Sequence, residues 1–224
     1  LFRSQGRMGR FVEGWLAGHA EFAIVTRVDS DQDLRSALRG SPARVGLDFT
    51  RAGLGASHGR ILLEAGLSAV IGTSGMDPAQ DAELETLALE RSLGCWVVPN
   101  FSLASCVQQR LAEQVAAWFP EAVIQEEHGI AKHDVPSGTS LETRRRMEAV
   151  RGADAAPIPI QSLRLSGVVA NQSVVLSGAG EVLRLVHETY DRSAYGPGLE
   201  RVLREMATLV GFRRGLDALL GARE

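Results

Sequence analysis

Residues 126–140 read EEHGIAKHDVPSGTS and combine groups that can bind an anion with one that can donate a proton. His128 titrates near neutral pH, so it can act as an acid, and Lys132 adds a positive point charge four residues later. An ordinary surface loop with solvated charges is the alternative interpretation. The whole stretch instead predicts a site for a small carboxylate substrate whose reaction needs an acid.

The end of this stretch predicts a helix that begins at the site. Pro136 disfavours a helical Val135, and the pattern from Thr139 to Glu142 is that of a capping box, so we expect the helix to begin there. The first N–H groups of a helix lack partners within it and attract anions. Three such N–H groups are therefore expected to face the substrate, those of Ser137, Gly138 and Thr139.

A second candidate site lies at the beginning of the chain, where residues 4–9 read SQGRMG. In dinucleotide-binding folds a glycine-rich turn at a helix N-terminus places backbone N–H groups against a pyrophosphate. Gly6 and Gly9 match the second and third glycines of that pattern, whereas Arg3 stands at the first. The strand that should precede the turn is missing, so we expect the native chain to extend beyond Leu1. Glycines used only for packing are the alternative.

Three further polar segments follow predicted strands. Asp29 comes about twenty residues after the glycines, where an acid takes the ribose hydroxyls of a dinucleotide; an aspartate in a surface turn is the alternative. Residues 48–50 (DFT) and 72–75 (GTSG) each end a strand. Open parallel sheets bind ligands at the carboxyl ends of their strands, so these segments predict a ligand site there.

Apolar periodicity predicts the elements that position these segments. The predicted helices are 6–18, 58–66, 78–92, 103–118 and 196–216, and the predicted strands are 22–28, 43–49, 67–73, 95–100 and 122–128. Residues 160–190 predict three more strands in an antiparallel meander. The expected fold is α/β: a Rossmann-like parallel sheet first, then an α+β half with a mostly antiparallel open sheet, with the clearest linker at 153–159.

Composition excludes several functional classes. The 224 residues are 45% hydrophobic and 23% charged, a globular balance rather than a disordered one. A net charge of −3 gives no basic excess for nucleic acid or an anionic membrane. Two cysteines make no disulfide framework, the apolar runs are far short of a membrane span, and the first twenty residues do not read as a signal peptide. We expect a cytosolic protein with no nucleic-acid partner, membrane partner or metal.

The motifs occur together in one known family. The chain resembles the dihydrodipicolinate reductases (4-hydroxy-tetrahydrodipicolinate reductases), which carry E-x-H-H-x-x-K-x-D-x-P-S-G-T-A where this chain has residues 126–140. The family's other motifs occur in the same order, as GRMG at 6–9, DFT at 48–50, GTSG at 72–75, NFS at 100–102 and R-x-x-Y at 192–195. The resemblance covers nearly the whole chain, and the chain is similar in length to the shorter bacterial members of the family.

The resemblance implies a cytoplasmic homotetramer of the diaminopimelate and lysine pathway. Residues 1–102, completed by 191–224, would bind the dinucleotide, and residues 103–190 would bind substrate and form the tetramer. A hydride from NADPH or NADH would reduce a cyclic unsaturated dicarboxylate, 4-hydroxy-tetrahydrodipicolinate, to tetrahydrodipicolinate. His128 would be the general acid, and Lys132 would be the second catalytic residue. The charge of Lys132 would lower the pKa of His128, and a bound dianion would raise that pKa again.

The remaining roles follow from matched positions. Substrate carboxylates would bind Lys132, Ser137, Gly138 and Thr139. The pyrophosphate would bind Gly6, Arg7, Met8 and Gly9, and the ribose Asp29. The nicotinamide side would be lined by Gly72, Thr73, Asn100, Phe101 and Ser102.

Several positions depart from the family pattern. Gly129 replaces the family's second histidine, which removes a substrate contact worth roughly 1.5–3 kcal/mol. Ala104 replaces a glycine beside the nicotinamide loop, and Gln172 replaces a histidine in a late strand. Ser30 stands where some members have an arginine for the 2′-phosphate, which favours NADH, although Arg27 and Arg3 remain as phosphate ligands.

These departures leave two alternatives. One is an oxidoreductase on the same scaffold that acts on another small carboxylate, which Gly129 and Ala104 suggest. The other is a dinucleotide-binding sensor or assembly subunit without catalysis, which the incomplete glycine motif suggests. Turnover with the lysine-pathway substrate separates both from the reductase.

Overall fold

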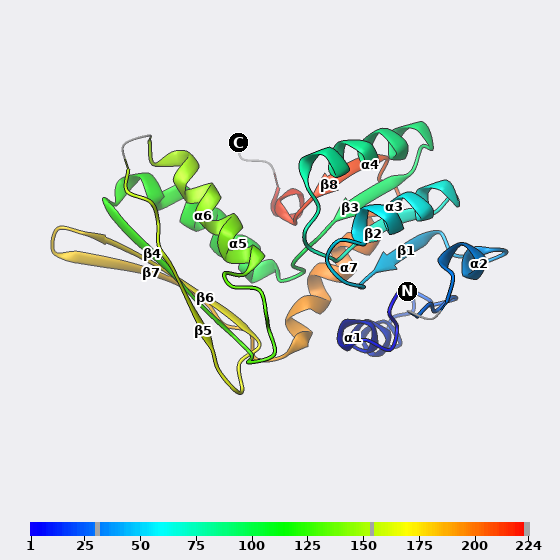
Figure 1. The fold of residues 1–224 in the computed structure, drawn as a ribbon, viewed down its shortest axis with the longest axis horizontal. Helices are drawn as coiled ribbons and strands as arrows, with labels where there is room; N and C mark the ends of the chain where they lie inside the picture. Colours follow the sequence, from blue (N-terminus) through cyan, green and yellow to red (C-terminus); the bar gives the residue numbers. More distant parts are fainter. Residues whose placement is uncertain (30–31, 153–154, 222–224) are drawn as a thin grey trace. The chain divides into compact units, whose positions relative to one another are not determined.

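The computed structural model describes residues 1–29, 32–152 and 155–221. The chain forms two compact units, each built on its own four-stranded sheet. Unit 1 comprises residues 1–101 and 195–224, and unit 2 comprises residues 102–194. Figure 1 shows the elements of both units along the chain. The predicted α/β class is confirmed.

The sheet of unit 1 is entirely parallel. It has the order β1-β2-β3-β8, with β1 at Val45–Asp48, β2 at Ser68–Ile71, β3 at Gly94–Val97 and β8 at Gly211–Arg214. β1 and β2 lie within the predicted ranges, and β3 overlaps its predicted range but begins one residue earlier, at Gly94. β2 and β3 are buried along their whole length, as expected for strands covered on both faces.

Helices cover both faces of this sheet (Figure 1). One face carries α3 (Gly55–Glu64) and α4 (Pro78–Glu90), and the other carries α1 (Arg7–Leu16) and α7 (Gly196–Glu205). A short helix, α2 (Leu34–Leu38), precedes β1. α4 begins where its sequence dictates, because Asp77 and Gln80 form a capping box around Pro78.

The predicted strand at 22–28 is wrong. Only Val28 forms a bridge, with Phe2, and Phe2 in turn bridges Asp48 of β1. The backbone of residues 1–3 is the partner that this segment finds, through bonds from Val28 N to Leu1 O and from Arg3 N to Val28 O. A β-branched segment forms a strand only where a neighbouring strand pairs with it, and in residues 22–28 the pairing is limited to Val28.

The predicted helix at 196–216 is also wrong in its second half. α7 ends at Glu205, and the chain turns and enters the sheet as β8 beside β3. The edge of β3 supplies the reason. The carbonyl of Leu93, just before β3, accepts a bond from Gly211 N (2.9 Å), and that of Val97, at its end, accepts one from Gly215 N (2.8 Å). Buried Trp96 on β3 adds a bond of 2.6 Å from its ring N–H to Gly215 O.

The sheet of unit 2 is mixed, with the order β5-β4-β6-β7. Its strands are β4 (Glu121–His128), β5 (Ile160–Arg164), β6 (Ala170–Gly178) and β7 (Glu181–His187). The antiparallel β6–β7 hairpin confirms part of the predicted meander, but β5 does not pair with β6. Instead β4 inserts between them, parallel to β5 and antiparallel to β6.

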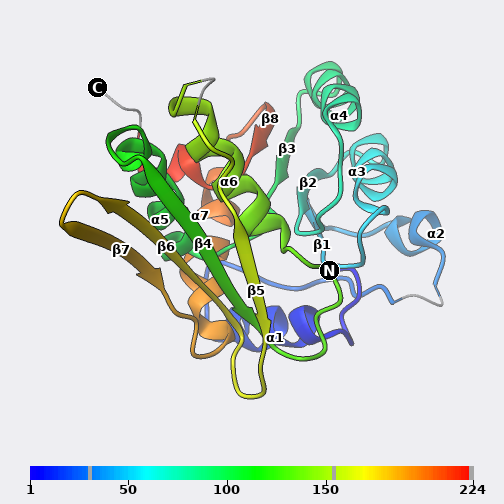
Figure 2. The same cartoon turned by 60° about the vertical axis from the view of Figure 1, so that its left-hand side comes forward.

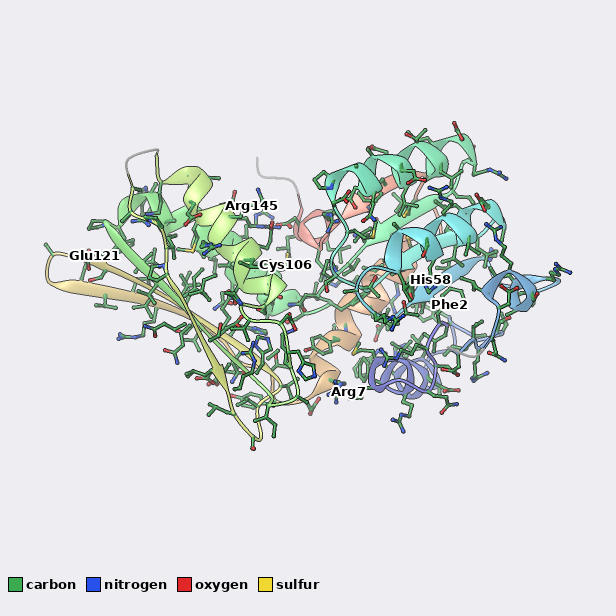
Figure 3. The ribbon with its side chains drawn as sticks, viewed as in Figure 1. Phe2, Arg7, His58, Cys106, Glu121 and Arg145 are labelled. Carbon is green, nitrogen blue, oxygen red and sulfur yellow. The ribbon has the colours of Figure 1, made fainter. Side chains whose placement is uncertain are left out.

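Two helices cover one face of this sheet (Figure 2). They are α5 (Leu103–Val115), capped by Ser102, and α6 (Gly138–Val150). Ile124, Val174 and Leu176 of the sheet pack with Met147 and Ala112 of the helices to form the core. Figure 3 labels Cys106 on α5, Arg145 on α6 and Glu121 at the start of β4. Short 3-10 turns lie at Ala116–Trp118, Arg192–Tyr195 and Asp217–Leu220.

No helix in the described part of the chain is long and apolar enough to cross a membrane. The predicted linker at 153–159 is described only from residue 155, since residues 153–154 lie outside the described ranges.

Candidate functional site

The glycine turn of unit 1, residues 3–9, is tight, and its glycines pack directly on the backbone of Arg3 and Ser4. Arg3 adopts a φ of 57°, and Gly6 N bonds to Arg3 O at 2.9 Å before α1 begins at Arg7, which is labelled in Figure 3. A Cβ on Gly9 would lie 2.2 Å from Arg3 O and 2.5 Å from Ser4 O, so no side chain fits there. Within the described residues, the N–H groups of Arg7, Met8 and Gly9 have no acceptor. A helix start of this kind suits a pyrophosphate.

The predicted ribose acid lies beside this turn. The carboxylate of Asp29 accepts bonds from Ser4 Oγ at 2.6 Å and from Gln5 N at 3.1 Å. The hydrogen bond from Ser4 is the largest cause of the lowered pKa of Asp29, so the carboxylate is charged at neutral pH. The Ser30 position lies outside the described residues.

The motifs that end the strands share the carboxyl edge of the sheet. Asp48 ends β1 and is 0% exposed; one oxygen accepts a bond from Thr50 N at 3.0 Å and lies 3.4 Å from His58 Nδ1. The ring of His58 is 6.2 Å from that of Phe2, and the two lie together in Figure 3.

Gly72, Thr73 and Phe101 lie at the same edge, just beyond β2 and β3. A Cβ on Gly72 would lie 2.5 Å from the ring of Phe49, which packs on Phe101 at 5.5 Å between ring centres. A cavity of about 710 Å³ in unit 1 lies elsewhere, because residues 44–47, 66–68 and 92–93 at the amino ends of the strands line it. The carboxyl edge, and not this cavity, is the candidate cofactor site.

His128 ends β4 in unit 2, on the face that carries the core. Only 8% of its surface is exposed, and its buried Nδ1 has no hydrogen-bond partner among the described residues. Burial is the largest cause of its lowered pKa; Glu126 opposes the lowering, and Lys132 and Arg164 reinforce it. The sequence predicted that the pKa of His128 is lowered, and it is, but burial contributes more to the lowering than Lys132 does.

Lys132 lies in the loop that joins β4 to α6. Its Nζ is 2.8 Å from Asp134 Oδ2, and both side chains are partly exposed. A salt bridge of this kind at the surface is weak, so a substrate carboxylate can replace Asp134 as its partner. The loop ends with a cis peptide between Val135 and Pro136.

The helix after this loop begins two residues earlier than predicted. Ser137 is the N-cap of α6, and its hydroxyl accepts a bond from Ser140 N at 3.2 Å. The predicted capping box from Thr139 to Glu142 is wrong, because Glu142 pairs with Arg145 and Arg146 instead. Within the described residues, the N–H groups of Gly138 and Thr139 have no acceptor.

The N–H group of Ser137 has a partner, contrary to prediction. It donates to both oxygens of Glu126, at 3.1 and 3.0 Å, so it does not face a ligand. Two of the three predicted N–H groups therefore remain as carboxylate donors. The loop Asn100–Ser102 is divided between the units, and Ser102 Oγ lies 3.1 Å from His187 Nε2 within unit 2.

Sequence reasoning did not identify Glu126 and Arg164 as site residues. Glu126 is 0% exposed on β4, and Arg164 ends the neighbouring strand β5 opposite His128. The available signal was the alternation of buried residues along β4, which places Glu126 on the same face as His128.

The structure shows the neighbours of two positions that depart from the family pattern, Gln172 and Gly129. The Gln172 side chain donates to Ser140 Oγ at 2.9 Å and accepts from Thr143 Oγ1 at 2.8 Å, so it links β6 to the start of α6. A Cβ added to Gly129 would lie 3.3 Å from Val168 O, its nearest neighbour.

Comparison with known proteins places the chain in one family throughout. The family model "Dihydrodipicolinate reductase, N-terminus" matches residues 4–101, and "Dihydrodipicolinate reductase, C-terminus" matches residues 104–216. The 4-hydroxy-tetrahydrodipicolinate reductase of Moorella thermoacetica is 33% identical, over 96% of this chain and 94% of its own length. That of Clavibacter michiganensis is 34% identical, over 98% and 85%.

A solved structure agrees with these matches. The dipicolinate-bound dihydrodipicolinate reductase from Paenisporosarcina sp. TG-14 superposes with a TM-score of 0.82 at 25% identity, covering 97% of both chains. The two family models follow one another in the order of the two units, and the similarity in sequence and in fold extends over nearly the whole chain. This chain therefore belongs to the dihydrodipicolinate reductase family of NAD(P)H-dependent oxidoreductases.

Proposed function

We propose that this chain reduces 4-hydroxy-tetrahydrodipicolinate to tetrahydrodipicolinate with NAD(P)H, in diaminopimelate and lysine biosynthesis. The observation that carries the proposal is in unit 2, where His128, Lys132 and the N–H groups of Gly138 and Thr139 border one loop. An acid, a cation and free helix N–H groups are what a reaction on a small dicarboxylate needs. The names of the relatives above support the same reaction.

In this proposal a substrate carboxylate binds at the start of α6. Gly138 and Thr139 donate their N–H groups to it, and Lys132 exchanges Asp134 for it. The Ser137 hydroxyl holds the first turn of the helix together through Ser140 N. The solved relative is bound to dipicolinate, a dicarboxylate, which is consistent with such a site.

His128 supplies the proton. The 4-hydroxyl group first leaves as water, which gives a ring with a conjugated C=N–C=C system. Hydride addition to that ring leaves an electron pair that a proton must neutralise, and His128 is the acid of this site. Its lowered pKa leaves it largely neutral before substrate binds. A bound dianion favours the protonated form, so the substrate itself prepares the acid.

The cofactor site in this proposal is the carboxyl edge of unit 1. When bound, NAD(P)H supplies the hydride. The residues present fit a dinucleotide, since the free N–H groups of Arg7, Met8 and Gly9 suit the pyrophosphate and charged Asp29 suits the ribose hydroxyls. Gly6 belongs to the same turn, and the nicotinamide side comprises Gly72, Thr73, Asn100, Phe101 and Ser102.

We further propose that NADH is the better cofactor. Of the two arginines that remained as phosphate ligands, Arg27 is paired with Glu13, and Arg3 donates to Thr50 O at 3.1 Å. A 2′-phosphate would have to replace those partners. The ratio of kcat/KM for NADH and NADPH tests this point, and a preference for NADPH would contradict it.

A cytoplasmic homotetramer is part of the same proposal. The face of the unit 2 sheet away from α5 and α6 exposes Val182 (49%) and Val186 (60%), while Leu183 and Leu185 point into the core. These two valines flank the exposed Arg184 on an open sheet face, and exposed apolar side chains in such a place suit a subunit interface. Light scattering after size exclusion would give the mass, and a monomer at micromolar concentration would contradict the proposal.

The decisive test of the reaction is a coupled assay. The preceding synthase generates the unstable substrate, and the decrease in NADH absorbance at 340 nm is followed with and without this chain. Oxidation that depends on both proteins, and that dipicolinate inhibits, is expected. NADH binding without oxidation would contradict the proposal and favour another carboxylate substrate or a sensor.

A further inference from the structure

Glu126 is a charged side chain with no exposed surface, and its partners lie at the start of α6 and on β5, next to the proposed substrate site. Its oxygens accept bonds from Ser137 N and from Ser140 Oγ (2.6 Å), both at the start of α6. Both terminal nitrogens of Arg164 lie 3.4 Å from Glu126 Oε1. A buried carboxylate persists only with partners of this kind, so the site is built around Glu126.

The protonation state of Glu126 follows from these bonds. Burial acts to raise the pKa of its carboxyl group, but hydrogen bonds, chiefly those from Ser137 and Ser140, outweigh burial and lower the pKa to about 2. Glu126 is therefore charged wherever an enzyme of this kind operates.

Arg164 fastens the loop that carries Lys132. Its Nε donates to Lys132 O at 3.1 Å, and its Nη2 donates to Asp134 O at 2.5 Å. The end of β5 is itself fixed next to His128, because Leu165 N bonds to His128 O at 2.9 Å. One guanidinium thus ties together β4, β5 and the loop, which has no regular secondary structure of its own.

The charges of Glu126 and Arg164 also act on His128. Its Nδ1 lies 4.0 Å from Glu126 Oε1, on the same face of β4. Arg164 acts from β5, and Lys132 and Asp134 act from the loop. The adjacent residues of β6, Ala170 and Gln172, carry no charge.

We propose that Glu126 and Arg164 are positioning residues of the substrate site, holding the Lys132 loop and the start of α6 in place and setting the protonation of His128. The inference deepens the proposed function and rests on it. Neither residue needs to touch the substrate. Their role is to keep the acid, the cation and the helix N–H groups in a fixed geometry before substrate binds.

The first test replaces the charge at nearly constant shape. Glu126→Gln removes the negative charge that opposes the lowering of the His128 pKa, so that pKa should fall further. An NMR titration of the His128 ring measures this without any turnover. In the assay, the alkaline limb of kcat/KM should move to lower pH, because a general acid must be protonated to act. A purely structural role would move neither quantity.

The second test keeps the charge and removes the geometry. Arg164→Lys retains a cation near Glu126 but cannot bond two carbonyls as a planar guanidinium does. Dipicolinate affinity, measured by calorimetry, should weaken by about 10- to 150-fold, the equivalent of one charge-assisted hydrogen bond. The KM for substrate should rise more than kcat falls. Circular dichroism confirms the fold of each variant.

The matched control is Glu142→Gln on α6, which removes a carboxylate from an exposed pair with Arg145 in the same unit. It should change neither the His128 titration nor dipicolinate affinity. The proposal is overturned if Glu126→Gln leaves the His128 pKa unchanged or raises it, or if Arg164→Lys binds dipicolinate like the wild type. If these shifts occur but the wild type oxidises no NADH with the lysine-pathway substrate, the positioning role holds and the proposed reaction is wrong.

Discussion

Gly9 offers a sharp test of the cofactor site, because its surroundings leave no room for a single methyl group. A Cβ there would lie 2.2 Å from Arg3 O, 2.5 Å from Ser4 O and 2.7 Å from Ser4 Cα. Ordinary contact begins at 3.4 Å, so the turn has to move by 3.4 minus 2.2, or 1.2 Å. All three neighbours are backbone atoms, so no side-chain rotation relieves the clash.

The displacement should weaken cofactor binding strongly. A shift of this size removes at least one N–H group from hydrogen-bond distance of a pyrophosphate, which costs about 1.5–3 kcal/mol. We therefore expect Gly9→Ala to raise the Kd for NADH by about 10- to 150-fold. Overpacking of the turn should also lower the free energy of unfolding by about 1–3 kcal/mol.

Gly14 in the same helix provides the matched control. No atom lies within 4 Å of a Cβ at that position, and the residue is exposed. Gly14→Ala should therefore raise the free energy of unfolding by about 0.5–1 kcal/mol, because alanine favours the helix, and leave NADH binding unchanged. Fluorescence titration with NADH and urea denaturation measure both variants. Binding by Gly9→Ala within about twofold of the wild type would refute this account of the turn.

The other predictions concern unit 2. His128→Gln should reduce kcat by about 100-fold or more with little change in dipicolinate affinity, and near-normal turnover would exclude it as the acid. Lys132→Ala should impair both affinity and rate, whereas an unchanged kcat at saturation would leave it a binding residue only. Gly129→His should lower the KM for substrate by about tenfold, because it restores the substrate contact that the family's second histidine makes. A side chain fits there if the carbonyl of Val168 moves by a few tenths of an ångström, and a higher KM would show that the histidine does not fit. Burial lowers the folded-state pKa of His128 and His187 below 6.5, so the unfolded state binds protons more readily and the free energy of unfolding should fall as pH drops below 6.5. It should fall again between pH 4.5 and about 2 as Glu126 becomes protonated, and urea titrations in which Glu126→Gln shows the same acid limb as the wild type would contradict that assignment.

The local elements of unit 1 were largely predictable from the sequence. β2 and β3 are continuous apolar runs bounded by turn residues, and α4 carries its own capping box. The prediction failed where an element depends on a distant partner. Residues 22–27 have the composition of a strand but find no ladder, and residues 211–214 become β8 because β3 offers an edge.

The same reason explains the errors in unit 2. β5, β6 and β7 follow one another in the sequence, which favours a meander, yet β4 separates β5 from β6. Thr139 and Glu142 have capping-box spacing, but Ser137 is held by buried Glu126 and so becomes the cap. In each case a long-range contact outweighed a local preference.

The family, the α/β class and the identities of the candidate acid, cation and glycine turn follow from the sequence alone, because they depend on residue type and short spacing. Which of the N–H groups remain available for a ligand depends on tertiary contacts. Among the described residues the N–H groups of Gly138 and Thr139 have no acceptor, whereas that of Ser137 donates to Glu126. The pairing of Glu126 with Arg164 likewise joins residues 38 positions apart through adjacent strands. Such contacts arise when a sheet brings distant segments together, and no local pattern records them.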